Sequence, residues 1–66
     1  MRYISIHTSA QGKLIVECKI KDALNKYILI DDFPNISNKG YNYNKTIDLV
    51  RYKYRHMIEG LDYKFN

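Results

Sequence analysis

The sequence predicts an α+β fold in which a three-stranded antiparallel β-meander carries one C-terminal α-helix packed on one face. Two segments near the N-terminus alternate apolar and polar residues, which is the period of a half-buried strand. The last third of the chain repeats apolar residues at intervals of three and four, which is the period of a helix. This β-β-β-α order favours a two-layer sandwich with one small core.

The first two predicted strands cover residues 2–8 and 13–21 and form a hairpin. Residues 9–12 between them have turn composition, and Gly12 adopts a positive φ readily because it has no Cβ. One face of the hairpin is expected to supply half of the core, namely Ile4, Ile6, Leu14, Val16, Cys18 and Ile20. The lone cysteine is thus expected to be a buried, unreactive thiol.

The third predicted strand covers residues 27–33, a run rich in β-formers. Pro34 ends it because proline has no N–H to donate to a ladder. The periodicity does not settle which side faces the core, since the two isoleucines compete with Leu29 and with the aromatic residues at either end. We expect this strand to contact apolar neighbours on both sides, and residues 35–43 to follow as an asparagine-rich loop.

The predicted helix covers residues 46–65 and presents one long apolar stripe to the sheet. The stripe consists of Ile47, Val50, Tyr54, Met57, Ile58, Leu61 and Phe65. Asn44 or Thr46 is expected to cap the helix by accepting a hydrogen bond from an N–H of the first turn. Gly60 weakens the helix interior by about 1 kcal/mol relative to alanine.

Length and composition predict one small domain over residues 1–66. A chain of this size buries only about 60% of its unfolded surface, so no large enclosed active site is expected. The N-terminus lacks the uninterrupted apolar run of a signal peptide, and no stretch reaches the roughly 20 apolar residues of a membrane span. We therefore expect a cytoplasmic protein that does not enter a membrane.

Few residues suggest catalysis. The sequence has no Gly-rich phosphate loop, HExxH, CxxC or nucleophile elbow, and its acidic residues lack the spacing of a calcium loop. His7 is a candidate general base for a small ribonuclease, although an exposed strand histidine fits its position better. We therefore expect no enzyme activity, no cofactor and no metal site.

A candidate contact surface lies on the outer face of the predicted helix, where a helix over a small sheet is normally polar. Its residues are Leu49, Tyr52, Lys53, His56 and Tyr63. Tyrosine serves protein interfaces well because its ring buries area at low entropic cost and keeps a polar tip. Scattered surface tyrosines also occur without a function, so the pattern favours a partner site without requiring one.

A second candidate surface combines the outer side of the sheet with the loop before the helix. Its aromatic and basic residues are Tyr3, His7, Lys19, Lys21, Lys39 and Lys45. The formal net charge of +4 is compatible with phosphate contacts, and tyrosine rings can stack on bases. Ile15 and Leu29 on the same side would equally suit a homodimer interface.

Two functions follow from these surfaces. We expect a small non-catalytic binding protein, an accessory or inhibitor protein of the phage or mobile-element type, that docks on a protein partner such as a component of nucleic-acid machinery. The alternative is a protein that binds nucleic acid directly through the sheet face and loop. A homodimer remains open beside both.

Overall fold

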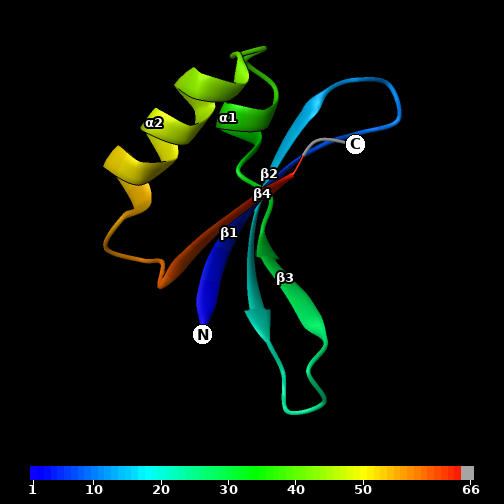
Figure 1. The fold of residues 1–66 in the computed structure, drawn as a ribbon, viewed down its shortest axis with the longest axis vertical. Helices are drawn as coiled ribbons and strands as arrows, with labels where there is room; N and C mark the ends of the chain where they lie inside the picture. Colours follow the sequence, from blue (N-terminus) through cyan, green and yellow to red (C-terminus); the bar gives the residue numbers. More distant parts are fainter. Residues whose placement is uncertain (65–66) are drawn as a thin grey trace.

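The computed structural model describes residues 1–64, and the side chains of residues 1–62. Its elements in chain order are β1 (Arg2–Thr8), β2 (Leu14–Lys21), β3 (Tyr27–Asp31), α1 (Pro34–Ser37), α2 (Tyr43–Tyr54) and β4 (Gly60–Lys64). The α+β prediction is confirmed (Figure 1). Within the described residues, however, the sheet has four strands instead of three, and two helices replace the one expected.

The sheet is mixed and has the strand order β3-β2-β1-β4. The predicted hairpin of β1 and β2 is present and antiparallel, with Ile4 opposite Cys18. β3 continues the sheet on the β2 side, also antiparallel, and its pairing is irregular near Cys18. β4 lies on the other side of β1 and runs parallel to it, with Leu61 opposite Ile4. The expected antiparallel meander is therefore only part of the sheet.

The predicted helix over residues 46–65 is wrong in both bounds. α2 begins at Tyr43 and ends at Tyr54. Gly60 starts β4 and so does not weaken a helix interior, while Phe65 lies outside the described residues. The short segment 60–64 has apolar residues whose spacing fits a strand as well as a helix. It forms a strand because the edge of β1 provides backbone hydrogen-bond partners.

The helix cap also differs from the expectation. The side chain of Asn42 accepts a hydrogen bond from the backbone N–H of Lys45 at 2.8 Å. Thr46 donates its hydroxyl to the backbone oxygen of Asn42, also at 2.8 Å, and is buried. Asn42 is thus the N-cap of α2, because the helix starts three residues earlier than the apolar repeat predicts.

One buried cluster forms the core between the sheet and the helices. Its members are Ile4, Ile6, Val16, Cys18, Phe33, Ile36, Ile47 and Val50. The strand residues and the two α2 residues confirm the predicted core positions, whereas Phe33 and Ile36 come from the segment expected to be a strand end and loop. Burial raises the pKa of the Cys18 thiol, which disfavours the reactive thiolate.

α1 occupies the place that β3 leaves open beside β2. β3 ends at Asp31, so no strand of the described residues pairs with the first half of β2 on that side. The buried Ser37 hydroxyl of α1 accepts a hydrogen bond from the backbone N–H of Val16 at 2.8 Å. Phe33, which precedes α1, has a left-handed backbone with φ 39°, and its ring lies 4.2 Å from that of Tyr54.

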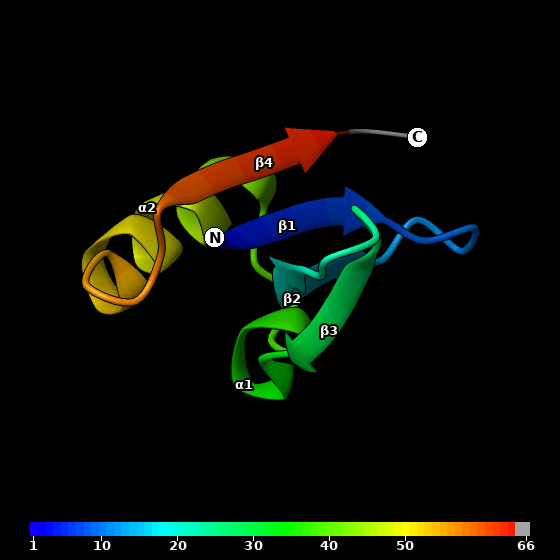
Figure 2. The same cartoon turned by 90° about the horizontal axis from the view of Figure 1, so that it is seen from below.

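The helices leave two parts of the sheet uncovered. Both helices contribute to the same buried cluster, so the opposite face of the sheet is open (Figure 2). In addition, β3 and the end of β2 extend away from the helices toward the bottom of Figure 1. All five residues of β3 are exposed, which contradicts the expectation of apolar neighbours on both sides of this strand.

Candidate functional site

The outer helix surface predicted from the sequence does not form as one strip. Tyr52 is 76% exposed on α2, and Lys53 is exposed beside it, but Leu49 is half-buried. His56 is exposed in the turn after the helix has ended. Tyr63 belongs to the backbone of β4, and its side chain lies outside the described part. The residues share a helix face only if the helix continues to residue 65, which it does not.

The second predicted surface is divided between two sides of the molecule. Tyr3, His7 and Lys19 alternate with the core residues of β1 and β2, so they lie on the open face of the sheet, as does Lys21. Lys39 and Lys45 come from the helical segment. The Lys45 ammonium lies 4.8 Å from the centre of the Tyr41 ring, and this contact is local to the start of α2.

A carboxylate partly neutralises the cations on the open face. Glu17 lies at the centre of the hairpin, where its Oε1 is 2.6 Å from His7 Nε2 and 3.5 Å from Lys19 Nζ. This contact links the two strands of the hairpin across the open face. Among the described residues, no group of three or more His, Cys, Asp or Glu side chains is arranged to hold a metal ion.

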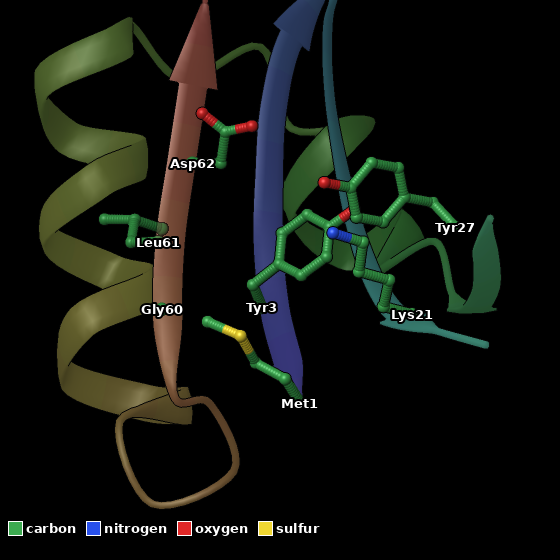
Figure 3. A pocket seen from close by; sticks show the side chains of 7 residues that line it. All are labelled: Met1, Tyr3, Lys21, Tyr27, Gly60, Leu61 and Asp62. Atoms are coloured by element: carbon green, nitrogen blue, oxygen red, sulfur yellow. The ribbon is translucent and has the colours of Figure 1, made fainter. Parts of the chain in front are cut away.

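The other end of the open face holds a shallow cavity of about 340 Å³ (Figure 3). It is lined by Met1, Tyr3, Lys21, Tyr27, Gly60, Leu61 and Asp62. The rings of Tyr3 and Tyr27 meet edge to face at 5.0 Å, and the Lys21 ammonium is 5.6 Å from the centre of the Tyr27 ring. Partial burial, with smaller effects of Tyr27 and Asp62, raises the pKa of the Tyr3 hydroxyl.

The largest departure from an ordinary protein surface is β3 itself. Its four consecutive apolar residues have exposed fractions of 58% for Tyr27, 46% for Ile28, 51% for Leu29 and 49% for Ile30. Leu24, in the turn before β3, is 76% exposed. β3 is an edge strand, so apolar side chains and unpaired backbone groups occur together along it. We define the β3 edge as residues 27–31.

The apolar run of β3 is visible in the sequence, but its exposure is not. A continuous apolar run in a strand indicates that both faces are covered. Within the described residues, the buried side chains of the two helices pack against β1 and β2 and leave β3 exposed. An apolar strand that its own chain cannot cover is a sign of a partner.

Comparison with protein-family models, with curated proteins and with solved structures found no match to this chain.

Neither described helix has the length and apolar character that a membrane span requires.

Proposed function

We propose that this chain is a non-catalytic protein-binding domain that engages its partner through the β3 edge. The observation that carries this proposal is the run of four exposed apolar residues on an edge strand. Exposed apolar edges promote association, and proteins that remain monomeric usually shorten, charge or cover them. A strand added by a partner would satisfy the backbone groups and cover the side chains together.

The rest of the surface supports this choice over the outer helix face. Tyr52 is the only large apolar side chain on α2 with a high exposed fraction among the described residues, and one such side chain is ordinary on a protein surface. A domain that binds in this way acts by covering a strand edge of the chain with which it pairs. This role requires no catalytic group.

Differential capture tests the proposal. Tagged wild-type protein and two variants, Leu29→Glu on the β3 edge and Tyr52→Glu on α2, are used to capture proteins from the native host after nuclease treatment. The glutamate introduced on β3 would lie opposite Lys19 within its own chain, so the fold should tolerate the substitution. We expect Leu29→Glu to abolish capture of the partner and Tyr52→Glu to retain it.

If Tyr52→Glu alone loses the partner, the binding site lies on the face of α2, and the proposal for the β3 edge is wrong. Circular dichroism of each variant shows whether the fold is intact. A captured protein that disappears on nuclease treatment would mean that the interaction passes through nucleic acid.

A second function, direct binding of nucleic acid, is supported by one observation. Tyr3, Tyr27, Lys19 and Lys21 gather on the open face of the sheet, where rings can stack on bases and lysines can contact phosphates. The carboxylates of Glu17 and Asp62 on the same side oppose phosphate binding. We therefore rank this function second.

Titration with labelled single-stranded RNA and DNA at several salt concentrations tests the second function. Binding should weaken as the salt concentration rises. In the double variant Lys19→Ala with Lys21→Ala, the slope of the logarithm of the binding constant against the logarithm of the salt concentration should become shallower by about one for each lysine that binds a phosphate. Lys39→Ala with Lys45→Ala is the matched control, since these lysines belong to the helical segment. Binding that is absent at low salt, or equally weakened by both pairs, would rule out the sheet face as the site.

A further inference from the structure

We infer that the partner which pairs with the β3 edge is a second copy of this chain, joined by antiparallel pairing of the two β3 strands centred on Leu29. This inference rests on the proposed function and specifies its partner. It requires that β3 directs backbone N–H and C=O groups to the open edge. It also requires that the charges and apolar side chains of one β3 edge match those of a second, antiparallel copy.

The backbone of β3 has donors and acceptors directed away from its own sheet. Asp22 N–H donates to the Lys26 oxygen at 2.8 Å, which makes Lys26 a residue bonded toward β2. Bonded and non-bonded residues alternate along an antiparallel strand, so Ile28 is also bonded toward β2. Tyr27 and Leu29 consequently direct their N–H and C=O groups to the open edge.

The charges at the ends of β3 select a second copy and its direction. Exposed Lys26 precedes the strand, and exposed Asp32 follows it. The five residues of β3 lie between Lys26 and Asp32 and separate them by about 20 Å, so the two charges cannot pair within one chain. Antiparallel pairing centred on Leu29 places Lys26 of each copy opposite Asp32 of the other. Parallel pairing would instead place like charges side by side.

The apolar side chains are complementary in the same register. Leu29 lies opposite Leu29 of the second copy, and Ile28 lies opposite Ile30. Ile28 and Leu29 lie in the regular part of the strand and point to its opposite sides, so pairing shields apolar surface on both sides. The pairing is isologous, as two-fold symmetry requires, and the two sheets become one continuous sheet.

Sedimentation over a range of protein concentrations tests the inference. The wild-type protein should approach twice the 7.9 kDa mass of the chain at high concentration. Leu29→Glu should remain a monomer because it places two carboxylates opposite each other, while Tyr52→Glu should dimerise as the wild type does. Lys26→Asp and Asp32→Lys should each raise the dimer dissociation constant about tenfold.

The decisive variant combines both charge reversals. Lys26→Asp with Asp32→Lys restores opposite charges at each end of the pairing, so its dissociation constant should return to within about threefold of the wild-type value. Recovery of the dissociation constant is specific to self-pairing, because a different protein would keep its own charges and would face two reversed charges on this chain. The double variant also needs no change in the apolar residues, which keeps the test valid if Leu29→Glu fails to fold.

Three outcomes would overturn the inference: a wild-type protein that remains a monomer at every concentration, a dimer that persists in Leu29→Glu, or a double reversal that is not restored. A monomeric wild type whose host capture still depends on Leu29 would refute the second copy and leave the proposed function standing. If the dimer dissociation constant is unchanged in Leu29→Glu, self-association occurs through another surface.

Discussion

Among single residues, Ser37 shows how one side chain completes the backbone of this small sheet. Its hydroxyl accepts from Val16 N–H at 2.8 Å and lies 3.2 Å from the Asp32 backbone oxygen, to which it can donate. Val16 is fully buried, and no strand lies beside it on that side within the described residues. The hydroxyl thus replaces the partner that a longer β3 would have supplied.

Ser37→Ala should therefore lower the free energy of unfolding by about 1–3 kcal/mol, because it leaves a buried N–H without a partner. Urea unfolding followed by circular dichroism measures the change. Ser9→Ala is the control, since Ser9 accepts from Lys13 N–H in an exposed turn where water can replace it, and a change within about 0.5 kcal/mol is expected there. Equal effects at both positions would contradict this role of Ser37.

At the scale of elements, α2 is positioned by residues that precede its apolar repeat. Asn42 caps the helix, and the first buried side chains come a turn later, at Thr46 and Ile47. Arg51 and Lys53 in the last turn suit the negative end of the helix dipole. The helix therefore starts where its cap is and not where its hydrophobic periodicity starts.

Asn42→Ala should lower the free energy of unfolding by about 1 kcal/mol, because the N–H of Lys45 loses its acceptor. Asn44→Ala is the matched control within the first turn. Alanine has the higher helix propensity at this exposed position, so no loss is expected there. Thermal and urea unfolding compare the two variants, and a larger loss at Asn44 would show that the cap is misassigned.

At the scale of the whole molecule, the first strand and the last described strand lie side by side. β4 runs parallel to β1, so the last described strand closes against the first. Figure 3 shows the two faces of β4, with Leu61 turned toward α2 and Asp62 turned the other way. Leu61 packs against the buried cluster, and Asp62 is exposed. Folding thus depends on a contact between residues nearly the whole chain apart.

Leu61→Ala should lower the free energy of unfolding by about 1–3 kcal/mol, since Leu61 is a partly buried side chain against the core. Asp62→Ala at the next position should change it by no more than about 0.5 kcal/mol. Urea unfolding of both variants measures the difference between the two faces of one strand. Equal losses would be inconsistent with β4 as the structure has it.

The sequence by itself determined the elements whose pattern is local and has one period. Alternation predicted β1 and most of β2 correctly, and it identified Ile4, Ile6, Val16 and Cys18 as core residues. The helical repeat likewise identified Ile47 and Val50 as core residues, whereas Thr46, expected as a cap, is buried beside them. These positions could be predicted because the pleat of a strand and the turn of a helix decide which residues share a face.

Only the tertiary structure decided the fate of residues 60–64 and of β3. The apolar residues of the first segment fit both periods, and the open edge of β1 selected the strand. The exposure of β3 depended on whether any element was left to cover it, and the buried cluster uses both helices elsewhere. Both outcomes depend on contacts between residues that are far apart in the sequence. That is why Tyr63 does not belong to a helix surface, while the β3 edge, which carries the proposed function, emerged only from the fold.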